Sequence, residues 1–407
     1  MTTRGLWCGP SDCGTNRAEV ADFVAKVADS GFNLLLPEVK GGHGKLRWPS
    51  ETFPHNIEEP YDKFDLPGAL VEEGKKRGVE LHAWFIDFFE GETGQAFREH
   101  PEWAACDAHG RPTNEEQLRG ERFTGLWMCP AQRPGYTDQW LIPTYEEFAQ
   151  RYDFDAVHHD YVRYPGDLAP DQYCFCDWCL ERIPEWAGFV NNAFPNEPFD
   201  HALYDREYLE AHWEQSPRVL PAYWDKLKRS EKSRFFLEGS FFRYGRQDLD
   251  YFFYQYRKEA ILRFVKESHH AVTEIRPGMK VSAAVFKNPV HSGRFIGQDW
   301  REFTPYVETM IPMDYRDHFP GTFDHYLGLL EETIERQKAW SAGSERYLTG
   351  FALWPLVREP EKEDDRSAHM AQTIKLIAEK NPAGCVMFCA GDLSRYGLWG
   401  AAAKAFA

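Results

Sequence analysis

Several acidic side chains stand directly after short apolar runs of the sequence. Such runs end in Pro37-Glu38-Val39-Lys40, in His158-His159-Asp160 and in Met313-Asp314-Tyr315, and Asp87 follows another. If the runs are neighbouring parallel strands, their carboxyl ends bring these carboxylates to one edge of the sheet. Groups of carboxyls at one edge favour acid and base chemistry.

A pair of carboxyl groups is what cleavage of a glycosidic bond requires, one as acid and one as nucleophile or base. We expect Asp160 to be the nucleophile or base and Asp314 the acid, with Glu38 as a further catalytic candidate. Strand periodicity puts Asp160 on the same face as His158, while His159 points the other way. For Asp314 an ion pair with Arg316 is the structural alternative, and the stereochemical outcome stays open.

Other polar and aromatic side chains near the same run ends are suited to sugar recognition. Lys40 and His43 lie in the glycine-rich segment Glu38–Lys45, where the backbone can approach a ligand closely or simply turn. Arg163 can orient a carboxylate or bind a hydroxyl. The expected substrate-binding residues are His158, Arg163, Tyr161, Lys40, His43, Asp87, Lys287, Tyr315, Arg316 and Trp354.

Eight short apolar runs alternate with amphipathic stretches, which predicts parallel strands with crossover helices. The predicted strands are Gly5–Cys8, Asn33–Val39, Val79–Phe85, Ala156–Asp160, Val281–Phe286, Thr309–Asp314, Tyr347–Leu353 and Gly384–Cys389. The predicted helices are Arg17–Ser30, Leu66–Arg77, Thr137–Arg151, Tyr251–Ile275, Phe323–Trp340 and Ser367–Lys380. Eight strand–helix units favour an α/β fold of the (β/α)8, or TIM, barrel type, in which residues at the strand ends carry the chemistry.

Two predicted connections are long, one after the third strand (89–136) and one after the fourth (165–250). Rim loops build the active site of such barrels, so both insertions are expected to form its walls. We therefore expect residues 1–407 to be a single barrel domain that contains a helical, cysteine-containing insertion at 166–250.

Three of the nine cysteines stand close together, at Cys174, Cys176 and Cys179. With Cys129 as a fourth ligand they can form a structural zinc site, although the spacing differs from that of a zinc knuckle. A disulfide and packed free thiols are the alternatives, and free thiols are preferred. We expect no cofactor and no metal in the active site.

The overall charge of −17 disfavours binding to nucleic acid and to anionic membranes. The sequence contains no apolar run of about 20 residues, the length of a membrane span. The expected partner is an oligosaccharide or glycoside, and a homo-oligomer stays open. Without a leader-like segment after Met1, a cytoplasmic location is expected, and a secreted form with its leader removed is the alternative.

The run Phe154–Pro165 resembles the strand-four signature of bacterial glycosyl-hydrolase-like (family-10-like) barrels. Softer similarities cover most of the chain, at Gly31–Lys40, Trp127–Pro130, Cys174–Cys179, Pro277–Val285 and Ile311–Tyr315. The resemblance implies a TIM barrel with glycosidase activity and Asp160 as the preferred catalytic residue. The pairing of a strand-four acid with Met313-Asp314-Tyr315 on strand six is also similar to the chitinase-like group, but Val162 stands where those enzymes have their catalytic glutamate.

Two other functions remain as alternatives. One is a carbohydrate-binding barrel without catalysis. The other is a metal-dependent hydrolase of the amidohydrolase type, which needs a His-x-His pair on its first strand, whereas Leu6-Trp7-Cys8 contains no histidine.

Overall fold

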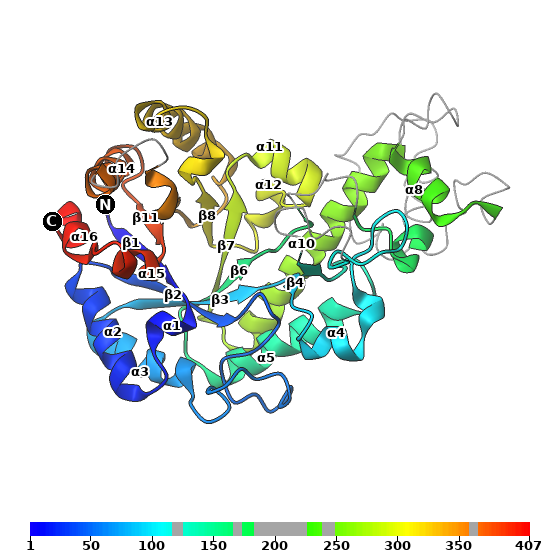
Figure 1. The fold of residues 1–407 in the computed structure, drawn as a ribbon, viewed down its shortest axis with the longest axis horizontal. Coiled ribbons are helices and arrows are strands. Elements are labelled where there is room, and N and C mark those ends of the chain that lie inside the picture. Colours follow the sequence, from blue (N-terminus) through cyan, green and yellow to red (C-terminus); the bar gives the residue numbers. More distant parts are fainter. Residues whose placement is uncertain (116–124, 166–172, 183–225, 238–248, 358–364) are drawn as a thin grey trace.

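Parallel strands close into an eight-stranded barrel at the centre of the molecule (Figure 1). The computed structural model describes residues 1–115, 125–165, 173–182, 226–237, 249–357 and 365–407. The barrel strands are β1 (Thr3–Cys8), β2 (Leu34–Lys40), β3 (Glu80–Ile86), β6 (Ala156–Asp160), β7 (Lys280–Phe286), β8 (Thr309–Met313), β9 (Arg346–Tyr347), β10 (Thr349–Ala352) and β11 (Gly384–Phe388). Neighbouring strands pair in the order β10-β11-β1-β2-β3-β6-β7-β8-β9, and β10 closes the ring by also pairing with β8. The predicted barrel is confirmed.

The seventh barrel position differs from the single strand that we predicted at Tyr347–Leu353. It is divided between β9, which pairs with β8, and β10, which pairs mainly with β11. The sixth strand ends at Met313, one residue earlier than predicted. The chain therefore changes neighbours at Leu348, where the ring closes.

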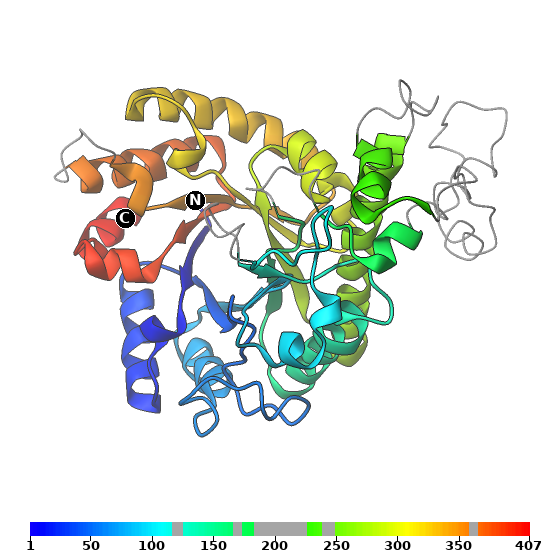
Figure 2. The same ribbon diagram turned by 45° about the vertical axis from the view of Figure 1, so that its right-hand side comes forward.

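Amphipathic helices surround the barrel, and the two ends of the chain lie side by side (Figure 2). The main helices are α2 (Arg17–Asp29), α3 (Leu66–Arg77), α5 (Ile142–Arg151), α10 (Leu249–Ile275), α13 (Phe323–Trp340), α14 (Arg366–Lys380) and α16 (Trp399–Phe406). The predicted helix Thr137–Arg151 begins with a π-helical turn, Thr137–Leu141. Pro143 follows in the first turn of α5, where its missing N–H is tolerated. None of the helices in the described ranges has the length and apolar character needed to cross a membrane.

The connection after β3 contains a two-stranded antiparallel sheet of β4 (Phe89–Glu90) and β5 (Leu126–Trp127), with α4 (Gln95–Glu99) between them. The predicted insertion 166–250 lies mostly outside the described residues. Within it the structure describes 173–182, 226–237 and 249–250, including α8 (Arg229–Leu237). The insertion boundaries therefore remain predictions.

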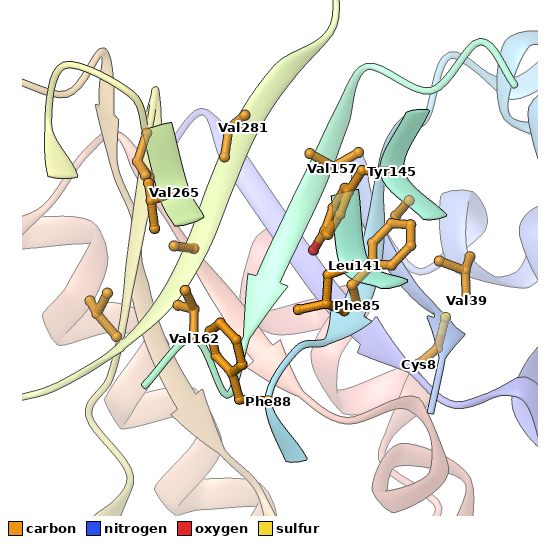
Figure 3. Close-up of a cluster of buried hydrophobic side chains, with 14 of the residues drawn as sticks. Cys8, Val39, Phe85, Phe88, Leu141, Tyr145, Val157, Val162, Val265 and Val281 are labelled. Atoms are coloured by element: carbon orange, nitrogen blue, oxygen red, sulfur yellow. The ribbon is translucent and has the colours of Figure 1, made fainter. Parts of the chain in front are cut away.

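The barrel strands bury both of their faces, and each face belongs to a different apolar layer. Inside the barrel lie Trp7, Leu34, Leu36, Trp84, Ile86, Ala284, Ile311, Leu348 and Val386. Between barrel and helices lies a second layer, where Val157 and Phe85 meet Tyr145 and Leu141, and Val281 lies near Val265 (Figure 3). Alternate residues of each strand thus point to the barrel interior and to the helices.

The closing contact requires a glycine at position 350. Gly350 pairs with Met313, and a Cβ on it would lie 2.6 Å from the carbonyl oxygen of Pro312. We expect Gly350→Ala to lower the free energy of unfolding by about 1–3 kcal/mol, because the two strands must move apart. The denaturation midpoint measures this change.

Gly328→Ala is the matched control for that substitution. Gly328 lies exposed within α13, and a Cβ there meets nothing within 4 Å. It should stabilise the protein by about 0.5–1 kcal/mol, since alanine favours a helix over glycine. Equal midpoints for Gly350→Ala and the wild type would contradict the role of Gly350 in closure.

Candidate active site

The carboxyl group of Asp160 lies at the inner edge of the barrel, at the C-terminal end of β6. Its Oδ2 accepts a hydrogen bond from Nε1 of Trp84 at 3.1 Å, and its Oδ1 accepts one from the backbone N–H of Tyr161 at 2.7 Å. The residue is only 8% exposed. Burial raises the pKa of this carboxyl to about 6, although the Tyr161 N–H and the charge of Arg163 favour the anion. Asp160 can therefore carry a proton close to neutral pH.

Directly after Asp160 the backbone turns through a left-handed conformation, with φ of 53° at Tyr161. Such a conformation costs a non-glycine residue about 1–2 kcal/mol and is concentrated at functional sites. The turn brings the Tyr161 ring against Phe89 and Trp127, with centroid distances of 5.1 and 5.5 Å. It therefore builds an aromatic surface beside the carboxyl.

Arg163 completes this surface. Its guanidinium lies 5.0 Å from the ring centroid of Trp127, 4.8 Å from that of Tyr161 and 4.7 Å from that of Phe286. The side chain is 5% exposed. Its positive charge favours the Asp160 carboxylate. The structure thus brings Asp160, Tyr161 and Arg163 together, as their spacing indicated.

His158 lies one layer deeper in the barrel and is fully buried. Its Nε2 accepts a hydrogen bond from Nε1 of Trp7 at 3.1 Å, so the proton belongs on Nδ1, 2.8 Å from the hydroxyl of Ser282. Burial lowers the pKa of His158 well below its usual value, which keeps the ring neutral. This position suits support of the barrel interior better than the substrate contact we expected.

Glu38 is a second carboxyl at the inner edge. Alternation from Leu34 and Leu36, which lie inside the barrel, directs Glu38 to the same face. Its Oε1 lies 2.8 Å from Nη2 of Arg47, and its side chain is 17% exposed. Burial raises its pKa, against the opposing effect of Arg47. Glu38 is the register partner of Trp84 on β3, and the indole N–H of Trp84 donates to Asp160.

His43 lies at the outer side of Glu38. Its Nε2 is 3.4 Å from Nη2 of Arg47 and 3.4 Å from Oε2 of Glu58. The side chain is 42% exposed, so it is accessible from solvent. Neither Arg47 nor Glu58 was identified from the sequence, because no spacing pattern links them to Glu38.

Asp314 points to the helix layer. Ile311 and Met313 pack in the barrel interior, and Asp314 follows with the opposite orientation. Its Oδ1 accepts a hydrogen bond of 2.8 Å from Nε2 of Gln337 on α13, and none of the described residues donates to its Oδ2. Burial raises its pKa well above the usual range. The structure therefore does not bring Asp314 together with Asp160. The suggested partner Arg316 donates to the carbonyl of Leu356.

The side chains of Asp87 and Lys40 are fully buried. Asp87 accepts a hydrogen bond from the Tyr145 hydroxyl at 2.6 Å and lies 2.9 Å from Nδ1 of His159. His159 also lies 3.0 Å from the Ser268 hydroxyl on α10, which confirms its predicted outward direction. These contacts connect the barrel to the helices.

The Lys40 ammonium lies 3.1 Å from Oε2 of Glu90, and both side chains are fully buried. It also donates to the carbonyl of Ile86 at 2.6 Å, and the Tyr136 hydroxyl donates to Glu90 at 2.5 Å. This ion pair fixes the start of the connection that leads to β4. No local pattern in the sequence links the two residues, since Glu90 lies 50 residues after Lys40.

The far rim of the barrel carries Tyr315, Lys287 and Trp354. The Tyr315 ring packs on Phe388 at 5.9 Å. Burial raises the Tyr315 pKa well above its usual value, and the charge of Asp160 adds to this effect. Lys287 donates to the carbonyl of His318 and lies 3.7 Å from the ring centroid of Phe319. Trp354 begins the turn after β10 and is 38% exposed, so its indole is available for stacking.

Comparison with known proteins identifies a related family for the part of the chain that contains Asp160. A family model described as glycosyl hydrolase-like 10 matches residues 3–175. "Glycosyl hydrolase YngK" of Bacillus subtilis (strain 168) is 24% identical over 201 residues, which are 44% of this chain and 36% of that protein. The chain thus matches about a third of the length of this curated relative. The resemblance to glycosyl-hydrolase-like barrels is confirmed.

Solved structures with the same fold include three glycosidases or glycoside hydrolase domains. The PgaB (BpsB) glycoside hydrolase domain from Bordetella bronchiseptica is 12% identical with a TM-score of 0.62, covering 100% of this chain and 99% of that one. A β-galactosidase from Rahnella sp. R3 is 13% identical (TM-score 0.61; 95% and 50%). α-L-Fucosidase isoenzyme 2 from Paenibacillus thiaminolyticus is 17% identical (TM-score 0.58; 99% and 49%). At these identities the likeness establishes the fold.

The raised pKa of Asp160 predicts that this residue destabilises the protein near neutral pH. Its carboxyl ionises near pH 4 in the unfolded chain but at about pH 6 in the folded one. Stability contributed by the protonated form is therefore lost as the pH rises from about 4 through about 6. We expect Asp160→Asn to be more stable than the wild type above pH 6, by about 3 kcal/mol at most. Unfolding curves at pH 4 and pH 8 measure the difference.

Asp153→Asn provides a control with the opposite sign. Lys75 and Arg276 hold the pKa of the exposed Asp153 below its usual value, so its favourable interactions exist at pH 8 and disappear on acidification. That variant should lose stability at pH 8 only. An Asp160→Asn variant whose stability relative to the wild type does not change with pH would refute the raised pKa.

Proposed function

We propose that this protein is a glycoside hydrolase whose central catalytic residue is Asp160. The observation that carries the proposal is a buried carboxyl group with a pKa of about 6 at the C-terminal end of a barrel strand. Such strand ends carry the catalytic residues of TIM-barrel enzymes. The match to the glycosyl hydrolase-like family includes this residue and its surroundings.

Asp160 is best suited to act as acid and base. A carboxyl with a pKa near 6 is partly protonated at neutral pH and can donate that proton to the leaving glycosidic oxygen. The resulting carboxylate is then stabilised by the N–H groups of Trp84 and Tyr161. The raised pKa thus favours the acid role, which we had expected for Asp314, over the role of nucleophile or base that we expected for Asp160 from the sequence.

Glu38 is the second carboxylate in this proposal. It faces the same side of the barrel as Asp160, and its contact with Arg47 favours the charged form. A carboxylate in that position can act as nucleophile, or as base toward a water molecule. Asp314 is less suited, because its carboxyl is buried against Gln337 in the helix layer.

The aromatic side chains around Asp160 support binding of a sugar. Tyr161 packs on the buried Trp127, Tyr315 lies close enough to Asp160 to be affected by its charge, and Trp354 offers an exposed indole at the rim. Aromatic faces pack well against the apolar faces of sugar rings. The overall charge of −17 disfavours polyanionic glycans. We therefore propose an uncharged oligosaccharide or glycoside as substrate.

The proposal predicts that Asp160→Asn loses hydrolysis on any glycan or aryl glycoside that the wild type cleaves. Removing a general acid lowers kcat by about 10²- to 10⁴-fold. A panel of such substrates, assayed for released reducing ends or phenol, measures the effect. Circular dichroism of the variant establishes that it is folded.

Two outcomes would contradict this assignment. Full activity of Asp160→Asn would show that the residue is not catalytic. Binding of oligosaccharides by calorimetry, with no hydrolysis by the wild type, would instead support a carbohydrate-binding barrel.

A pair of substitutions tests the choice of the second carboxylate. We expect Glu38→Gln to lower kcat by about 10²- to 10⁴-fold, because it removes the carboxylate proposed as nucleophile or base. Asp314→Asn should remain active, since it replaces a buried carboxyl of raised pKa with a neutral group of similar shape. Steady-state kinetics on a cleaved substrate compares the two. The reverse ranking would identify Asp314 as the partner of Asp160.

A further inference from the structure

We propose that Cys129, Cys174, Cys176 and Cys179 together bind one structural zinc ion. The Sγ atoms of these four residues all lie within 4.8 Å of one another, and all four residues are buried. The Sγ of Cys129 is 3.6 Å from that of Cys179 and 3.7 Å from that of Cys176. Four sulfurs placed tetrahedrally about 2.3 Å from a zinc ion are about 3.8 Å apart. These two separations therefore match those of a tetrahedral zinc site.

The arrangement fits a metal better than the alternatives. A disulfide unites two sulfurs at about 2 Å, and it does not explain why four sulfurs meet at one point. Packed free thiols behave as small apolar groups that need no common centre. An iron–sulfur cluster occupies the space between its thiolates and holds them farther apart. Four converging thiolates are typical of structural zinc.

The surroundings of the cluster suit thiolates. The Sγ of Cys174 accepts hydrogen bonds from the backbone N–H groups of Cys106 and Cys176, both at 3.4 Å. Such N–H donors orient and stabilise a thiolate ligand. Zinc with four thiolates carries a net charge of −2. The buried guanidinium of Arg257 interacts with Cys174 and Cys179 and so offsets part of this charge.

Metal binding would join two connections that are distant in the sequence. Cys174 and Cys176 lie on an irregular segment that follows β6 and precedes a helical turn containing Cys179. Cys129 follows β5, two residues after Trp127, whose ring packs on Tyr161. Without any metal, the two segments are already linked by a hydrogen bond from the backbone N–H of Phe175 to the carbonyl of Cys106, which lies in the same connection as Cys129. The zinc would therefore hold in place the wall beside Asp160. This inference is independent of any hydrolytic activity.

Metal analysis of the purified full chain tests the proposal. The protein is produced in zinc-supplemented medium and purified with a reducing agent and without a chelator. We expect about one zinc per chain in the wild type, and at least tenfold less in Cys174→Ser and in Cys179→Ser. Cys106→Ser is the matched control, because this neighbouring thiol donates to the Ala104 carbonyl and is not one of the four. It should retain the zinc.

A spectroscopic measurement on the wild type keeps the test valid if the serine variants do not fold. In protein produced with cobalt in place of zinc, four thiolate ligands should give intense sulfur-to-cobalt absorption and the visible bands of tetrahedral cobalt. Absence of a stoichiometric metal in the wild type would overturn the proposal. An intact mass lower by the hydrogens lost in disulfides, or iron in place of zinc, would overturn it as well.

Discussion

Side chains along a barrel strand point alternately to the interior and to the helices, and this alternation determines what each acidic residue can do. Glu38 and Asp160 fall on the inner face, on the two strands that flank β3. Asp87 and Asp314 fall on the outer face, where each is hydrogen-bonded to a helix, through Tyr145 and Gln337 respectively. Four carboxyls at similar strand ends are thus divided into two kinds by orientation alone.

The outer carboxyls have a structural function of their own. A buried polar group is costly unless it is hydrogen-bonded, so Asp87 and Asp314 favour one position of the helices relative to the barrel. The buried pair of Lys40 and Glu90 fixes the connection to β4 in the same way. Removing either partner of that pair would leave an uncompensated charge in the interior. The rim beside Asp160 is consequently held by polar contacts as well as by apolar packing.

The fold could be predicted from the sequence because strands and helices leave a local pattern. The strand at Ala156–Asp160 has the predicted bounds, and α3 and α13 coincide with the predicted helices. The orientation of Asp314 could not be predicted, because both faces of a barrel strand are buried and Thr309–Met313 shows no polar face. Contacts across the fold, such as that of Arg47 with Glu38, follow from the closed barrel and leave no mark in local spacing. The four-cysteine cluster could be predicted in part, since three of its members are close in the sequence.

The position of the Asp160 carboxyl and the shape of the aromatic wall beside it are determined by different parts of the chain. The strand that carries Asp160 is paired on both sides, with β3 and with β7, and its carbonyl accepts the N–H of Asp87. The aromatic wall beside it comes instead from the connection that contains β5 and from the turn at Tyr161. Changes in the connection that contains β5 can therefore reshape this wall without moving the Asp160 carboxyl. A scaffold of this kind can acquire new specificities by changing its loops while the chemistry of its centre is preserved.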